Sequence, residues 1–385
     1  MKPTRRHGPL RALCAALAGL CLPTAALSDL PTETLTVAPA LTAKNRAYVG
    51  DVAINHIADG KLHVVDTDTG AYLGVIGSGF TGQYTLSADK SEVIIATTYL
   101  SRGQRGERAD IVEVWDANSL SFKYEIPIVE KRAMALNYRG LVRLSADGRW
   151  LFVQNATPAT SVTVVDMQAR KQAAEIPTPG CWGIYPPQSR SDRFSTLCGD
   201  GTIATIMLDG EGNAASRTAS SKLFDADKDA WFVQGEQDGD NYRFVSFLGH
   251  VASVNLGGDT AAAGETWPLI RSADDRKKAW RPGGYQPLAV HAGSGRLYVA
   301  MHPQGAEGSH KNPAKEIWAY DLKTKKRVAR MPGHAAVALT ASADGKRVYA
   351  IDIEKLSLVV MDIGAKPKVR NVTAVGDIPV QVEAY

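Results

Sequence analysis

A short phrase that recurs along most of the chain limits what this sequence can fold into. In each copy, alternating apolar residues lead to a polar anchor, then a turn, then a second strand-like stretch. The copies lie at 62–66, 111–116, 162–166, 206–209, 251–255, 317–321 and 358–362. Their anchors, six aspartates and one asparagine, are 50, 50, 43, 46, 66 and 41 residues apart. This spacing is typical of a repeat built from four-stranded units of about 40–50 residues.

The pattern inside each unit predicts antiparallel hairpins. Turn pairs such as Thr69-Gly70 separate segments of alternating polarity. A second phrase, Ser-Ala-Asp before an alternating strand, begins at residues 87, 145 and 342. One such sheet cannot bury both of its faces, so neighbouring sheets are expected to stack radially. The seven anchors therefore predict an all-β fold, a seven-bladed β-propeller; two stacked sandwiches are the alternative.

The N-terminal residues have a different character. Four Lys/Arg residues precede or open the apolar run 12–22, and small residues then continue to Ser28. This is the pattern of a cleavable secretory signal peptide. The run is also shorter than the ~20 residues that a permanent bilayer-spanning helix requires. We therefore divide the chain into a signal peptide (1–28), an N-terminal arm (29–45) and the propeller domain (46–385).

Removal of the predicted signal peptide changes the net charge of the chain. The whole chain carries a formal charge of +4, and residues 1–28 hold four Lys/Arg and no Asp/Glu, so the mature chain is neutral. A neutral chain lacks the electrostatic footprint of a nucleic-acid binder. No later segment has the apolar length to cross a bilayer. We expect neither nucleic acid nor membrane as a partner.

Cysteine usage fits an exported protein. Cys14 and Cys21 fall within the predicted signal peptide, which leaves Cys181 and Cys198. Two cysteines in an exported chain pair by default, although two free buried thiols are the alternative. A bond between them would close a short loop and stabilise the fold by roughly 3 kcal/mol through chain entropy.

The motifs of self-sufficient chemistry are missing. The sequence has no phosphate-binding loop, nucleophile elbow, zinc-protease helix or C-x-x-C pair. The acidic segment 225–229 lacks the glycine turn and closing glutamate of a calcium loop. His302, Glu307 and His310 share one loop but have no clear further zinc ligand. We expect no metal site and no catalytic residue here, which indicates a scaffold or binding role.

Several long and unusual runs carry a family resemblance. They are 97–116, 154–162, 180–182, 198–201, 280–285 and 301–311. Through these runs, about residues 45–385 resemble the heavy subunit of the tryptophan tryptophylquinone amine dehydrogenases, and the aromatic amine dehydrogenase branch more than the methylamine branch. Cys181 and Cys198 fall at the family's disulfide positions.

The resemblance implies a heavy subunit in a periplasmic α2β2 heterotetramer. The tryptophan tryptophylquinone and the catalytic aspartate are then expected on the light subunit, and this chain binds no cofactor. The assembled enzyme would oxidise primary amines to aldehyde and ammonia. Its electrons would pass to an azurin- or amicyanin-like blue copper protein.

The resemblance also implies a substrate-channel segment. The matching stretch is 51–57, with Ile54, Asn55 and Ile57 as channel residues. The stretch lacks the phenylalanine of the family, and plain packing is the alternative role for Ile54 and Ile57. The alternative function is a stand-alone periplasmic β-propeller that binds a ligand or protein without catalysis. A self-sufficient quinoprotein propeller would need a calcium site that the sequence does not show.

Overall fold

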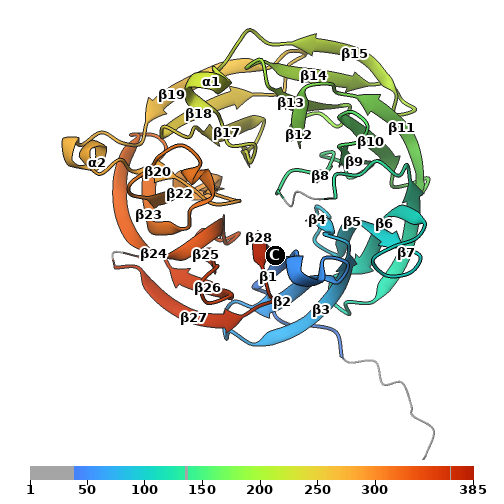
Figure 1. Cartoon of the computed structure of the whole chain (residues 1–385), viewed down its shortest axis with the longest axis horizontal. Coiled ribbons are helices and arrows are strands. Elements are labelled where there is room, and N and C mark those ends of the chain that lie inside the picture. The colour runs from blue at the N-terminus through green and yellow to red at the C-terminus, as the bar shows by residue number, and fades with distance from the viewer. Residues whose placement is uncertain (1–38, 135–137, 365) are drawn as a thin grey trace, which may run out of the picture. The chain divides into compact units, whose positions relative to one another are not determined.

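The computed structural model describes residues 39–134, 138–364 and 366–385. Residues 40–385 form one compact unit, in which antiparallel sheets stand around a central opening (Figure 1). The predicted signal peptide, with Cys14 and Cys21, lies outside the described residues, and so does most of the predicted arm. Among the described residues, no helix has the length and apolar character to cross a membrane.

Five of the sheets have four strands each. The first contains β28 (Pro379–Ala384), β1 (Arg46–Asp51), β2 (Gly60–Asp66) and β3 (Tyr72–Gly79). The second contains β4 (Gln83–Leu86), β5 (Glu92–Leu100), β6 (Arg108–Asp116) and β7 (Phe122–Ile128). The third contains β8 (Val142–Leu144), β9 (Trp150–Asn155), β10 (Ser161–Asp166) and β11 (Lys171–Pro177). The fourth contains β12 (Cys181–Tyr185), β13 (Arg193–Cys198), β14 (Ile203–Leu208) and β15 (Ala214–Ala219). The fifth contains β16 (Glu236–Asp238), β17 (Asn241–Val245), β18 (His250–Asn255) and β19 (Ala262–Pro268).

The remaining eight strands form one sheet. They are β20 (Arg281–Pro282), β21 (Leu288–His291), β22 (Arg296–His302), β23 (Ala314–Asp321), β24 (Lys326–Ala341), β25 (Arg347–Asp352), β26 (Ser357–Asp362) and β27 (Lys368–Ala374). The helical segments are short: η1 (Ile54–His56), α1 (Ala226–Asp229), α2 (Ala273–Lys277), η2 (Ala292–Ser294) and η3 (Ser309–Lys311).

The all-β propeller is confirmed, but the prediction of seven blades is wrong. The described residues form five four-stranded blades, and the last eight strands are one continuous sheet. The 16-residue strand β24 joins that sheet, because it pairs with β23 over its first part and with β25 over its last part. His334 and Ala335 bend it with φ angles of 48° and 45°. Sequence periodicity counts repeat units, and it does not report whether hydrogen bonds keep two units as separate sheets.

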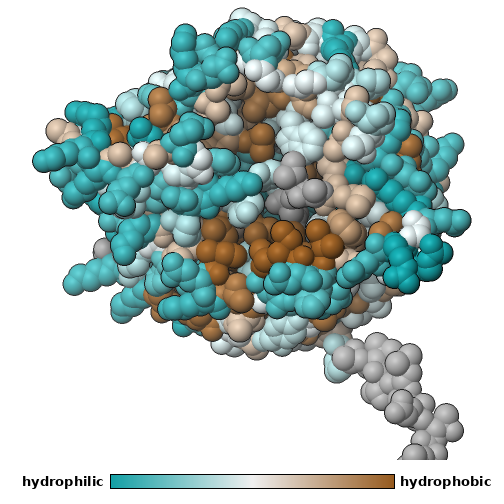
Figure 2. Space-filling model, viewed as in Figure 1, coloured by the Kyte–Doolittle hydropathy of each residue, from teal (hydrophilic) through white to brown (hydrophobic). Residues whose placement is uncertain are grey.

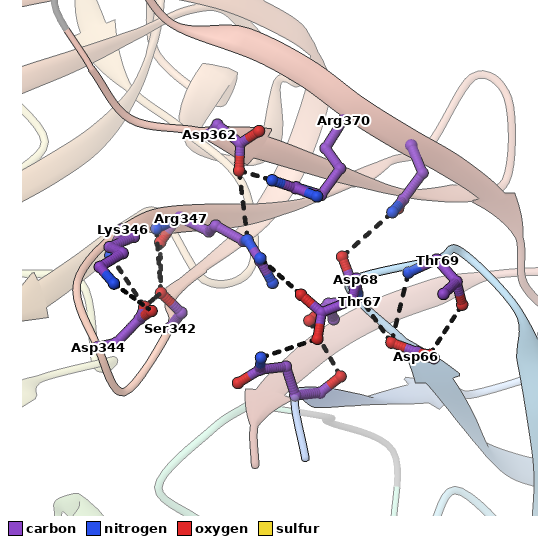
Figure 3. A network of polar contacts seen from close by, with 12 residues as sticks. Asp66, Thr67, Asp68, Thr69, Ser342, Asp344, Lys346, Arg347, Asp362 and Arg370 are labelled. Carbon is purple, nitrogen blue, oxygen red and sulfur yellow. Dashed lines mark hydrogen bonds and ion pairs between the residues drawn. The ribbon is translucent and has the colours of Figure 1, made fainter. Parts of the chain in front are cut away.

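The two ends of the propeller domain close the ring. The last strand, β28, pairs antiparallel with β1, so that Val49 lies opposite Val382. On the adjoining sheet, Arg347 Nη2 lies 2.6 Å from Asp68 Oδ1 and its Nε lies 3.3 Å from Asp362 Oδ1 (Figure 3). The ion pair between Arg347 and Asp68 joins the first sheet to the last, although the two residues lie far apart in sequence.

The recurring aspartates act locally, as caps of turns. Asp66 Oδ1 accepts a hydrogen bond from the backbone N–H of Asp68, at 2.8 Å, and Asp66 Oδ2 accepts one from the Thr69 hydroxyl at 2.8 Å (Figure 3). In the Ser-Ala-Asp phrase, the Ser342 hydroxyl donates to Asp344 Oδ1 at 2.6 Å. Such side-chain bonds to neighbouring backbone stabilise turns, which is why both phrases could be recognised from sequence.

The apolar core lies between neighbouring sheets. One cluster, for example, brings Ile94 and Val112 of the second sheet against Leu151 and Val153 of the third. Alternate residues of each strand point into these layers, as the period-2 pattern requires. The stacked sheets give the rigid frame on which the loops stand.

One end of the ring carries most of the long loops. Because the strands alternate in direction, the loops after β1, β5, β9, β13, β17, β22 and β25 lie at the same end of their sheets. The connections between four-stranded sheets lie there too. We call this end the top face.

Candidate functional site

A buried carboxylate anchors the predicted channel segment. Asp51 Oδ1 accepts hydrogen bonds from the backbone N–H groups of Ala53 (2.9 Å) and Ile378 (2.8 Å). Its Oδ2 accepts one from the backbone N–H of Asp377 at 2.8 Å and lies 3.6 Å from His63 Nε2. Burial by itself raises the Asp51 pKa, but the His63 side chain and the three backbone donors lower it to about 2. The carboxylate is therefore ionised and held from several directions.

The three predicted channel residues lie in one turn on the top face. The backbone of Ala53 is left-handed, with φ of 42°, and it redirects the chain into η1. Ile54 is 57% exposed, Asn55 is exposed and Ile57 is half-buried. Figure 1 shows this turn as the blue coil beside the central opening, and Figure 2 shows apolar surface at that place. The exposure of Ile54 argues against plain core packing, while its role in a channel stays a prediction.

An ion network joins the inner edge strands of two sheets. Arg139 Nε and Nη2 donate to the two carboxylate oxygens of Glu383 at 2.6 and 2.7 Å, and Arg139 Nη1 donates to Glu236. Glu383 lies on β28 and Glu236 on β16, and these are edge strands of two different sheets. The three side chains are only 15%, 11% and 8% exposed. The network therefore ties distant sheets together through the middle of the ring.

One cation in this network serves two carboxylates. Burial lowers the Arg139 pKa, but Glu236 and Glu383 more than offset that effect and raise it. For Glu236, burial raises the pKa and outweighs the attraction of Arg139 and Arg143. The Gln234 amide also donates to Glu236, at 2.6 Å. Such a network holds these side chains in place.

The top face also contains a cavity of about 530 Å³. Its walls include Tyr138 and the aromatic residues Trp231, Phe232 and Phe247, with Lys311 among the polar residues at its edge. This volume lies in the range of small-ligand sites. Trp231 is held in a stack on Phe244, with ring centroids 5.2 Å apart, so the aromatic wall is preformed.

The other sequence candidates lie at a strand end, in a connecting loop and in a short helix. His302 is 3% exposed, lies 3.0 Å from the Pro303 carbonyl through Nδ1, and has its pKa lowered by burial. His310 and Glu307 are exposed on the same loop. Within the described ranges, no group of three potential ligands could hold a metal ion. The acidic segment 225–229 forms α1, where Asp225 caps the helix.

The two remaining cysteines and a basic loop also lie at the top face. Cys181 and Cys198 are directly opposite in β12 and β13 and form a disulfide. The loop 101–107 projects between β5 and β6 with exposed side chains that include Arg102 and Arg105. Both features frame the face without adding a reactive group.

Sequence reasoning missed the residues that hold this site together. Asp51 and Arg139 look ordinary in sequence, because several of their partners are remote: Glu383 lies 244 residues from Arg139, and Asp377 and Ile378 lie 326 and 327 residues from Asp51. Glu236 and Glu383 sit in short strands without a distinctive pattern. The one available signal for Asp51 was its place at the end of an apolar strand segment.

Fold and face together define a β-propeller that presents an apolar turn at the rim of its central opening. The chain belongs to the methylamine dehydrogenase heavy chain family, whose pattern matches residues 43–384. The methylamine dehydrogenase heavy chain of Methylobacillus flagellatus is 26% identical over 360 residues, which are 92% of this chain and 88% of that protein. The heavy chain of Methylophilus methylotrophus is also 26% identical, over 92% of this chain and 86% of its own length. The resemblance is thus confirmed at the level of the family.

Solved structures agree on the fold alone. The periplasmic gluconolactonase of Pseudomonas aeruginosa superposes with a TM-score of 0.61 over 88% of this chain and 98% of that chain, at 14% identity. Propellers of different activity share this architecture, so function must be argued from the site and the family. The preference for the aromatic amine dehydrogenase branch stays a prediction.

Proposed function

We propose that this chain is the heavy subunit of a periplasmic amine dehydrogenase. In this assembly it holds a light subunit that carries tryptophan tryptophylquinone, in an α2β2 heterotetramer. The enzyme oxidatively deaminates primary amines to aldehyde and ammonia and passes the electrons to an azurin- or amicyanin-like copper protein. Membership of the methylamine dehydrogenase heavy chain family supports the subunit role.

The exposed turn η1 is the observation that carries the proposal. Ile54 is a large apolar side chain with 57% of its surface exposed, and it stands on a turn anchored by a buried carboxylate. Single exposed apolar residues need no explanation, but a rigidly held one beside a central opening suits a surface that a partner covers. The light subunit would cover the top face here, and Ile54, Asn55 and Ile57 would form one wall of the substrate channel.

The residues of this chain do not fit the quinone itself. Trp280 and Trp318 lie against each other, with ring centroids 5.1 Å apart. Both are at most 4% exposed, and Arg330 covers both rings at 5.2 and 5.1 Å. Trp318 Nε1 donates to Glu316 at 2.6 Å. This pair packs the sheet, so the cofactor is expected on the partner.

Reconstitution tests the assignment. The chain is co-expressed with a light subunit of this family from the same organism, and the purified complex is examined for a quinone absorption band that primary amine bleaches. The heavy chain alone should be colourless. Comparing methylamine, tyramine and longer alkyl amines, with azurin or amicyanin as acceptor, defines the substrate. A partnerless, inactive preparation from cells that contain both genes would favour the stand-alone binding propeller instead.

A matched pair of variants tests whether the light subunit binds the top face at Ile54. Ile54→Asp places a charge on the proposed contact surface, whereas Val372→Asp changes an equally exposed apolar residue on the outer strand β27 (54% exposed). We expect Ile54→Asp to weaken light-subunit binding and to raise KM for amines. Equal behaviour of both variants would place the light subunit elsewhere.

A further inference from the structure

The shape of η1 depends on contacts that originate outside the turn. Within the turn, the backbone N–H of His56 donates to the Ala53 carbonyl, and the backbone N–H of Asp59 donates to the His56 carbonyl. Neither bond sets the angle at which the turn leaves β1. That angle is set at Ala53, whose left-handed backbone (φ 42°, ψ 51°) is unfavourable for a residue with a Cβ atom. Such a conformation persists only where its surroundings hold it.

Asp51 supplies that support. Its side chain is 2% exposed, and it accepts the backbone N–H of Ala53 together with those of Asp377 and Ile378 in the connection before β28. The carboxylate therefore pins η1 to a segment more than 320 residues away in sequence. Without it, three backbone donors in this region would lose their acceptor.

Two neighbouring residues, His63 and Gly376, restrict the position of the Asp51 carboxylate. His63 is 6% exposed, its Nδ1 lies 2.8 Å from the Tyr72 hydroxyl, and its Nε2 faces Asp51 Oδ2 at 3.6 Å. Gly376, with φ of 64°, lies so close to Asp51 that an added Cβ would overlap the carboxylate. These neighbours leave the Asp51 side chain one orientation.

We propose that Asp51 is a positioning residue that fixes the direction of η1 and thereby sets which amines the enzyme accepts. The inference rests on the proposed function, in which Ile54 and Ile57 form a wall of the channel. Asp51 touches no substrate. It acts by holding two apolar side chains at a fixed distance from the opposite wall, and a small displacement of such a wall changes the selectivity between amines of different size.

Asp352 provides a matched control on the same face. It ends β25 as Asp51 ends β1, it is 3% exposed, and its Oδ1 accepts the backbone N–H groups of Glu354 and Lys355 at 3.0 and 2.9 Å. Substituting it removes a buried turn-capping carboxylate of the same kind. Its turn is not part of the proposed channel wall.

The first measurement uses the full chain alone. Hydrogen exchange is followed by mass spectrometry for Asp51→Asn, Asp51→Ala and Asp352→Asn. Asp51→Asn keeps the side-chain volume, but its amide group places donors against backbone donors. We expect both Asp51 variants to speed exchange at 52–59 and 376–378, and Asp352→Asn to speed it at 353–356 only. Unchanged exchange at 52–59 in folded Asp51 variants would overturn the proposal.

The second measurement uses the complex with the light subunit. The ratio of kcat/KM for methylamine to that for phenylethylamine is compared among Asp51→Asn, Asp352→Asn and Ile54→Ala. We expect Asp51→Asn and Ile54→Ala to change this ratio roughly tenfold, through KM more than kcat, and Asp352→Asn to leave it unchanged. If Ile54→Ala alone changes the ratio, the role of Asp51 is refuted while the channel stands. If neither changes it, η1 is not the channel wall and the role of Asp51 falls with it, whereas the subunit assignment still stands on the amine oxidation by the complex.

Discussion

Replacing Arg139 by methionine tests whether the ion network in the central opening holds the ring together. The variant keeps a long side chain but leaves Glu236 and Glu383, which are 8% and 11% exposed, without their shared cation. Removing one partner of a buried ion pair typically costs ~3–5 kcal/mol, because the remaining charge stays buried and uncompensated. We expect Arg139→Met to lower the free energy of unfolding by about that amount at neutral pH.

The same variant also predicts how the loss of stability changes with pH. Burial already raises the Glu236 pKa above its usual 4.5, and loss of Arg139 raises it further. A carboxyl group with a raised pKa binds its proton more tightly in the folded state, so stability increases as pH falls through that folded pKa. The deficit of Arg139→Met should therefore shrink as pH falls from neutral towards the ordinary glutamate pKa of 4.5.

Urea denaturation followed by circular dichroism measures both effects, with Glu236→Gln as the contrasting variant. Glutamine removes one of two carboxylates that compete for one cation, and its amide oxygen still accepts from Gln234. Its cost should stay below about 1 kcal/mol. A loss below about 1 kcal/mol for Arg139→Met as well, or a deficit that grows as pH falls, would refute the reasoning.

Three further predictions concern the top face. Replacing Cys181 and Cys198 by serine should lower the free energy of unfolding by about 3 kcal/mol, because the disulfide closes a loop of 17 residues. If reduction of the wild-type chain leaves its urea midpoint unchanged, this prediction is wrong. The Asp51 pKa of about 2 lies below its usual 3.8, so its contribution of about 2 kcal/mol should be present above about pH 4 and fade towards about pH 2. The difference in stability between the wild-type chain and Asp51→Asn, measured across that window, checks this. Gly376→Ala should cost about 2 kcal/mol, because φ is 64° and the new Cβ meets Asp51; a thermal midpoint equal to that of the wild-type chain would exclude the contact.

The parts of the structure that sequence predicted are those set by neighbouring residues. Asp66 caps its turn through residues two and three positions ahead, and Ser342 bonds to Asp344. The strands were also predicted from local sequence. Successive side chains of a strand point to opposite faces of the sheet, so a half-buried strand has alternating polarity. The pairing of Cys181 with Cys198 was predicted from the expected export of the chain and from the number of cysteines that remain.

The sequence predicted only part of the candidate site. The segment 51–57 was identified through the family resemblance, and the structure then showed Ile54 exposed on a fixed turn. Its support by Asp51 was not foreseen, because Asp377 and Ile378 become neighbours of Asp51 only when β28 pairs with β1. The same holds for Arg139, whose two partners lie on strands from different sheets.

The sequence by itself determined a chain of repeated β units with capped turns, one available cysteine pair and a family relationship. Tertiary structure alone decided how the units join. It merged eight strands into one sheet through β24, where the sequence predicted separate blades. It also closed the ring through β28 and placed Arg139 between Glu236 and Glu383. Turns and strands depend on residues a few positions apart, whereas sheet boundaries, ring closure and buried ion pairs depend on which distant segments meet.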